Sequence, residues 1–70
     1  MRIDIKHRFT GAVIFSHDTE NNTMKLTVEA AVSIRASLDG AFLDGAFLDG
    51  AFLDGASLDG ASLDGASLDG

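Results

Sequence analysis

The stretch from Ala36 to Gly70 reads ASLDG AFLDG AFLDG AFLDG ASLDG ASLDG ASLDG, which is seven units of five residues. A period of five matches neither the 3.6 residues of a helical turn nor the two of a strand, so one uninterrupted helix or strand would spread the leucines over all directions. The chain must therefore turn once in each unit. Asp-Gly is suited to that turn, because glycine adopts positive φ freely and aspartate favours local turn hydrogen bonds.

Between the turns, each Ala-x-Leu segment is short enough to be extended. Alanine and leucine then point to one side of the chain and the middle residue points to the other. The predicted interior consists of the alanine that opens each unit together with Leu38, Leu43, Leu48, Leu53, Leu58, Leu63 and Leu68. One unit alone buries almost nothing, so this core forms only when units stack on one another.

The repeat Ala-(Ser/Phe)-Leu-Asp-Gly resembles that of the pentapeptide-repeat proteins, in which a small residue, a polar residue, a central Leu or Phe and two outward residues follow one another. The resemblance covers residues 36–70 without a break. It implies a mostly β fold, a right-handed quadrilateral β-helix in which four pentapeptides make one square coil. Seven units correspond to about 1.75 coils. The implied stacked pairs are Leu38 with Leu58, Leu43 with Leu63, and Leu48 with Leu68.

The last coil of such a short solenoid is expected to expose leucines and unpaired backbone groups. The leucines at this open end are Leu53, Leu58, Leu63 and Leu68. Burying a leucine contributes about 1.5 to 3 kcal/mol, so covering several of them would stabilise a dimer. The sequence therefore predicts a homodimer through the C-terminal coil, with fraying of that coil as the alternative. The near-identity of the seven units is also what an engineered or truncated chain would show.

Three phenylalanines depart from the family pattern. Phe42, Phe47 and Phe52 take the second position of their units, which should face solvent. Each ring could lie on the surface as an isolated hydrophobe, which is common in proteins. Exposed large apolar residues in so small a chain also indicate a contact surface, here a girdle on several sides of the square.

Charge is divided unevenly along the chain. Residues 1–35 hold five basic and four acidic side chains, for a net charge of +1, whereas residues 36–70 hold seven aspartates and no base, for −7. This acidic ladder consists of Asp39, Asp44, Asp49, Asp54, Asp59, Asp64 and Asp69. Direct binding of nucleic acid is disfavoured, because such binding needs Lys and Arg to neutralise phosphates. The resemblance instead implies an alternative function, an acidic imitation of a DNA duplex that regulates an enzyme such as DNA gyrase or a topoisomerase.

Residues 1–35 are expected to cap the repeats. Apolar and polar residues alternate over residues 3–9, Thr10-Gly11 is a turn, and residues 12–15 return, so residues 2–16 are predicted to form a β-hairpin. In this alternation Ile3, Ile5, His7 and Phe9 share one face. The next six residues, which include His17, are predicted to be a polar loop.

A helix is predicted over about residues 24–34, with Thr23 or Asn22 as its N-cap. Met24, Val28, Ala31 and Val32 then share one apolar face. Residues 24–29 also alternate like a strand, so both interpretations of that segment remain open.

The sequence contains no pattern that indicates an enzyme. His7 and His17 lie in no ligand or nucleophile motif, there is no cysteine, and no phosphate-binding loop or zinc motif is present. The Asp-Gly repeats lack the spacing of known calcium sites. We therefore expect no catalytic, cofactor or metal site. Without a membrane span or a signal peptide in the sequence, we expect a soluble cytoplasmic protein that acts as a structural or interaction module.

Overall fold

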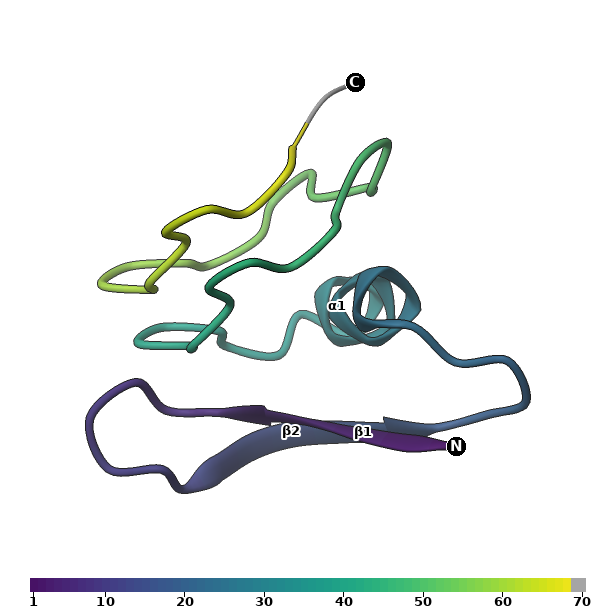
Figure 1. The fold of residues 1–70 in the computed structure, drawn as a ribbon, viewed down its shortest axis with the longest axis horizontal. Coiled ribbons are helices and arrows are strands. Elements are labelled where there is room, and N and C mark those ends of the chain that lie inside the picture. Colours follow the sequence, from purple (N-terminus) through teal and green to yellow (C-terminus); the bar gives the residue numbers. More distant parts are fainter. Residues whose placement is uncertain (69–70) are drawn as a thin grey trace.

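The chain forms a β-hairpin, one helix and a series of turned repeats, in that order (Figure 1). The structure is a computed structural model, and it describes residues 1–68. β1 spans Arg2–Lys6, β2 spans Val13–Asp18 and α1 spans Met24–Ser33. The repeats follow from residue 36, and Figure 1 shows them stacked on the hairpin with α1 alongside. The fold is rich in extended structure and has one short helix.

The two strands of the hairpin pair antiparallel. Ile3 lies opposite His17 and Ile5 lies opposite Phe15, and the register shifts between Ile5 and Lys6. The sequence predicts a hairpin over residues 2–16, whereas β2 continues to Asp18. His17, which the sequence places in a loop, therefore lies on a strand and is partly buried.

Phe9 does not lie where the alternation of residues 3–9 predicts. Its ring is 80% exposed, whereas Ile5 on the same predicted face is fully buried. The reason is that β1 ends at Lys6 and residues 8–10 form a turn, which interrupts the alternation of a strand. The Arg8 guanidinium covers part of the ring, with its carbon 4.6 Å from the ring centre.

The segment that could have been helix or strand is a helix. Thr23 is the N-cap, and its hydroxyl accepts a hydrogen bond from the Leu26 N–H at 3.1 Å. Thr27, Val28 and Ala31 face inward and are buried. Asn22, the other candidate cap, is buried instead between the helix and the hairpin, where its amide donates to the carbonyls of Met1 and His17.

The helix ends in a sharp change of direction that starts the repeats. Arg35 adopts a positive φ of 59°, and its N–H donates to the Val32 carbonyl. The N–H of Ala36 donates to the Ala31 carbonyl. This pair of bonds is a Schellman motif, which satisfies carbonyls that the helix end leaves without partners. The chain thus leaves the helix in a fixed direction at the first residue of the first repeat.

In each of the six units whose Asp-Gly pair the structure describes, the chain turns once, as the period of five predicts. In the first unit the Ala41 N–H donates to the Leu38 carbonyl at 3.0 Å, and Gly40 has a φ of 75°. The same bond recurs in the following units, and the glycines from Gly40 to Gly65 have φ values between 71° and 76°. Positive φ at the third residue of a four-residue turn is typical of a type II turn, which favours glycine there.

Successive layers of the repeats are joined by parallel bridges between residues twenty positions apart. The bridged pairs are Ser37 with Ser57, Phe42 with Ser62, and Phe47 with Ser67. Backbone hydrogen bonds accompany these bridges, each from a first-layer N–H to a second-layer carbonyl. The pairs are Leu38 with Ser57, Gly40 with Asp59, Leu43 with Ser62, Gly45 with Asp64 and Leu48 with Ser67. Twenty residues equal four units, the spacing that pairs Leu38 with Leu58.

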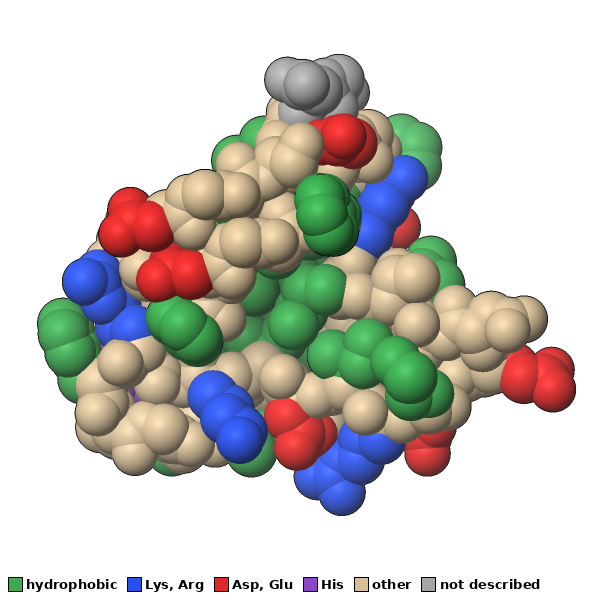
Figure 2. All heavy atoms as spheres, in the orientation of Figure 1, with side chains coloured by type: hydrophobic (Ala, Val, Ile, Leu, Met, Phe, Trp, Pro, Cys, Tyr) green, Lys and Arg blue, Asp and Glu red, His purple; other side chains and the backbone are tan. Residues whose placement is uncertain are grey.

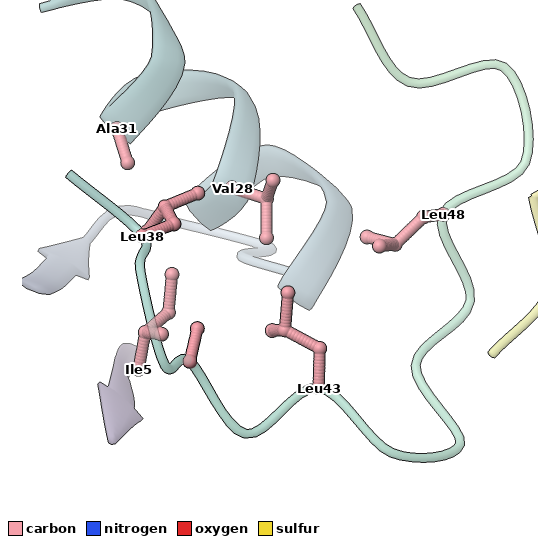
Figure 3. Packing of buried hydrophobic residues seen from close by; sticks show 7 residues of the cluster. Ile5, Val28, Ala31, Leu38, Leu43 and Leu48 are labelled. Atoms are coloured by element: carbon pink, nitrogen blue, oxygen red, sulfur yellow. The ribbon is translucent and has the colours of Figure 1, made fainter. Parts of the chain in front are cut away.

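One hydrophobic core connects the N-terminal segment with the first layer of repeats (Figure 3). Its buried members are Ile5 from β1, Val28 and Ala31 from α1, and Leu38, Ala41, Leu43 and Leu48 from the repeats. These leucines are at most 2% exposed. Farther along the chain the leucines are covered less, and Leu68 is 47% exposed. The core is therefore densest where the repeats meet the hairpin and helix.

Candidate interaction surface

The three phenylalanines of the repeats lie on the surface. Phe42 is 51% exposed, and Phe47 and Phe52 are each 80% exposed. Their outward direction follows from the extended backbone, because the neighbouring Ala41 and Leu43 point inward and are buried. Two of the three backbone N–H groups donate to the N-terminal segment. Phe42 donates to the Lys6 carbonyl at 2.8 Å, and Phe52 donates to Glu29 Oε2 at 2.9 Å.

In the second layer, serine occupies the position that phenylalanine holds in three of the four first-layer units, the other being Ser37. The Ser57 hydroxyl donates to Asp39 Oδ1 at 2.6 Å, and Ser62 and Ser67 donate likewise to Asp44 and Asp49. The backbone N–H of Asp59 donates to the same Asp39 oxygen at 2.9 Å. The first-layer carboxylates therefore join the two layers by hydrogen bonds. These bonds oppose the like-charge repulsion that the acidic ladder implies.

No local pattern in the sequence predicts this Ser–Asp pairing, because the partners are 18 residues apart and meet only once the units stack.

The hydrogen bonds change the acidity of one of these carboxyls. The pKa of Asp39 lies below its ordinary value, chiefly because the Ser57 hydroxyl donates to the carboxylate. Partial desolvation opposes the change, and the Asp59 N–H adds to it. Donors that favour the charged form lower the pKa of a carboxyl.

A stability change in acid should follow from this lowered pKa. A carboxyl whose pKa is lower when folded stabilises the fold above its unfolded pKa, and the stabilisation is lost as pH falls through the folded pKa. We expect the urea concentration at the midpoint of unfolding to decrease as the pH is lowered from 7 to about 3. Ser57→Ala should reduce this pH dependence. Ser33→Ala, which removes a hydroxyl bonded to a backbone carbonyl, is the control. An unchanged pH dependence in Ser57→Ala would contradict the assignment.

The N-terminal segment is fastened to the repeats by polar contacts as well as by the core. The Arg8 N–H donates to the Gly40 carbonyl at 2.8 Å, and its guanidinium donates to the Gly60 carbonyl at 3.0 Å. His7 forms an antiparallel bridge with Ala41. Arg8 thus contacts both layers of the repeats.

Two shallow hollows lie where the N-terminal segment meets the first layer. One, of about 360 Å³, is lined by Lys6, Met24, Phe42 and Leu43 among others. The other, of similar volume, is lined by Met24, Lys25 and Phe47 among others. Figure 2 shows hydrophobic side chains gathered between the repeats and the hairpin, with charged side chains around them. Phe42 and Phe47 are therefore walls of hollows that share Met24, a residue that the sequence assigns only to the helix face.

The repeats match a known family. A sequence model described as pentapeptide repeats (8 copies) matches residues 34–70, which is more than half of the chain. The chain belongs to the pentapeptide-repeat family. Pentapeptide repeats generally form a β-helix and serve as structural or interaction modules. No curated protein and no solved structure matches the chain.

The leucines predicted at the open end of the pentapeptide repeats differ in their exposure to solvent. Leu53, Leu58 and Leu63 are partly buried, and Leu68 is exposed. The carboxylates of Asp54, Asp59 and Asp64 lie at exposed turns, like those of the first layer. Asp69, the last member of the acidic ladder, lies outside the described residues.

The two histidines of this pentapeptide-repeat chain lie in different surroundings. His7 Nδ1 accepts hydrogen bonds from the N–H groups of Phe9 and Thr10, and His17 lies on β2. Among residues 1–68, no three His, Cys, Asp or Glu side chains are placed to hold a metal ion. Over the same residues, no helix is long and apolar enough to cross a membrane.

Proposed function

We propose that this chain is a non-enzymatic structural module that associates with a second copy of itself. In this proposal the repeats form a right-handed quadrilateral β-helix of about 1.75 coils. The contact involves the far layer of the repeats, from Leu53 to Leu68, and the rings of Phe42, Phe47 and Phe52. The hairpin and helix cover the opposite end.

The exposure gradient of the leucines is the observation that carries this proposal. Leu38 is fully buried between the N-terminal segment and the second layer, whereas Leu68 in an identical pentapeptide is 47% exposed. The far layer therefore has the side chains of a core without a complete covering. Each leucine that a second copy buries adds up to about 1.5 to 3 kcal/mol, less the cost of association.

The phenylalanines support the same proposal from the sides of the module. Three rings exposed by half or more within eleven residues are unusual for a chain that stays alone in water. Aromatic side chains are enriched at protein interfaces because they bury much area at little entropic cost. The hollows beside Met24, which Phe42 and Phe47 border, give the rings of a second copy an apolar recess.

A triple substitution tests the role of the rings. We expect Phe42→Ser, Phe47→Ser and Phe52→Ser together to weaken association, raising the dissociation constant by about tenfold or more, measured by sedimentation equilibrium. Serine is the residue that other units of the repeat use at this position. Phe9→Ser is the matched control, because Phe9 is also 80% exposed but lies in the hairpin turn. The same dissociation constant for the triple variant and the unmodified chain would remove the rings from the interface.

The charge of the repeats favours a second candidate function. Residues 36–70 carry seven aspartates and no basic residue, and the described turns expose their carboxylates. We propose as the alternative that this acidic surface imitates a DNA duplex towards an enzyme such as DNA gyrase, as the family resemblance implies. Inhibition of gyrase supercoiling at micromolar chain, lost on Asp→Asn substitution at Asp54, Asp59 and Asp64, would support this function. Unchanged supercoiling would dismiss it.

A further inference from the structure

Every unit of the repeats ends in an Asp-Gly pair, which can undergo a spontaneous rearrangement. The backbone nitrogen of the glycine attacks the side-chain carboxyl carbon of the aspartate, and one water molecule leaves, so that a five-membered succinimide forms. Water then adds back to one of the two ring carbonyls. Opening at the side-chain carbonyl restores aspartate, and opening at the backbone carbonyl gives isoaspartate, in which the main chain runs through Cβ. No oxidant, reductant or catalyst is needed.

The structure divides these chemically identical pairs into two classes. We propose that the open-edge aspartates, Asp54, Asp59 and Asp64, are sites of isoaspartate formation, whereas Asp39 and Asp44 in the first layer resist it. The rearrangement needs the glycine nitrogen and the aspartate carboxyl to be free to approach each other. This inference concerns the covalent chemistry of the turns and does not depend on self-association.

Both reacting groups are held at the first-layer turns. The Gly40 N–H donates to the Asp59 carbonyl at 2.8 Å, and the Gly45 N–H donates to the Asp64 carbonyl at 2.8 Å. Asp39 Oδ1 accepts hydrogen bonds from the Ser57 hydroxyl and the Asp59 N–H. Attack at Asp39 therefore requires several inter-layer hydrogen bonds to break first.

Asp44 is held in the same way as Asp39. Its Oδ1 accepts from the Ser62 hydroxyl and from the Asp64 N–H at 3.1 Å. The lowered pKa of Asp39 adds to its protection. The glycine nitrogen attacks a neutral carboxyl more readily than a carboxylate, because hydroxide is a better leaving group than oxide. A lower pKa means that a smaller fraction of the Asp39 carboxyl is neutral.

At the open-edge turns the two reacting groups themselves carry no such bonds, although the backbone N–H and carbonyl of Asp59 and Asp64 bond to the first layer. Within residues 1–68, the N–H groups of Gly55, Gly60 and Gly65 make no hydrogen bond, and neither do the carboxylates of the three aspartates before them. All six residues are exposed. These turns also lie in the part of the repeats where the leucines are least covered, so local opening there is expected to cost less.

The product would loosen the stacking of the layers. Isoaspartate adds one methylene to the main chain and converts the old backbone carbonyl into a free carboxylate, so the four-residue turn no longer closes in the same geometry. At Asp59 the change would displace the N–H and carbonyl that bond Asp39 and Gly40. Isomerisation at the open edge is thus expected to progress to loss of the second layer.

The experiment follows the conversion at each aspartate in the same molecule. The chain is kept at pH 7.4 and 37 °C for several weeks, at a concentration where light scattering shows a monomer. It is then denatured and digested partially with a protease that cleaves before Asp but not before isoaspartate. Fragments that begin at residue 1 have a different mass for each cleavage position, so mass spectrometry identifies each turn despite the identical repeats.

We expect cleavage before Asp54, Asp59 and Asp64 to be lost about tenfold faster than before Asp39 and Asp44, since one net hydrogen bond corresponds to roughly that factor. A sample aged in urea is the control and should convert all five at similar rates. Ser57→Ala should accelerate conversion at Asp39 while leaving Asp44 unchanged. Equal rates in the folded chain, with the folded state verified by circular dichroism, or faster conversion at Asp39 and Asp44, would overturn the proposal.

Discussion

Replacing Leu38 with alanine should lower the free energy of unfolding by about 2 to 5 kcal/mol. Leu38 is fully buried among Ile5, Val28 and Ala31, so the substitution leaves a cavity that the helix and hairpin cannot easily fill. A chain of 70 residues is expected to have a total stability of roughly 4 to 10 kcal/mol. The variant is therefore expected to be partly unfolded at 25 °C, as measured by urea titration of the circular dichroism signal.

Leu68→Ala is the matched control, because both leucines lie in the same pentapeptide Ala-Ser-Leu-Asp-Gly. Leu68 is 47% exposed, so its loss should cost less than about 1 kcal/mol. If Leu38→Ala unfolds the chain completely, Leu38→Val gives a smaller cavity and keeps the comparison measurable. Similar costs at Leu38 and Leu68 would show that the first layer does not share a core with the N-terminal segment.

Gly40→Ala should lower the free energy of unfolding by about 2 to 5 kcal/mol, and more than Gly45→Ala does. Both glycines have a positive φ, 75° and 73°, which costs any other residue about 1 to 2 kcal/mol. The two positions differ in what surrounds them. A Cβ at Gly40 would lie 2.5 Å from His7 Nε2, whereas a Cβ at Gly45 would have no atom within 4 Å.

The His7 ring cannot move aside without loss, because its Nδ1 accepts from the backbone N–H groups of Phe9 and Thr10. Chemical denaturation of both glycine variants measures the difference. Adding His7→Ala to Gly40→Ala should recover the part of the loss that comes from the clash, which a double-mutant cycle isolates. Equal losses at Gly40 and Gly45 would place His7 away from the first repeat.

The regular features of the repeats could be predicted because each depends on residues within five positions. Asp-Gly needs only its own φ values to form a turn, and alternation within Ala-x-Leu fixes which side chains point inward. The twenty-residue spacing of the bridges is the spacing implied by the family resemblance. The surface position of Phe42, Phe47 and Phe52 follows from the same alternation.

Features that depend on stacked layers could not be predicted in the same way. Ser57 lies 18 positions after Asp39 and meets it only once the chain between them has folded into a layer. Met24 borders the hollows beside Phe42 and Phe47 because of how α1 docks, which no local pattern encodes. The sequence predicts the wrong surroundings for Phe9 and His17, because strand alternation does not indicate where a strand ends.

The mass of the unmodified chain in solution, measured by light scattering over a concentration series, tests the proposed self-association most directly. One chain has a mass of 7.3 kDa. We expect the average mass to rise towards twice that value, with a β-rich circular dichroism signal retained throughout. A mass that stays at 7.3 kDa up to millimolar concentration, with the same β signal, would contradict the proposal that the repeats mediate self-association.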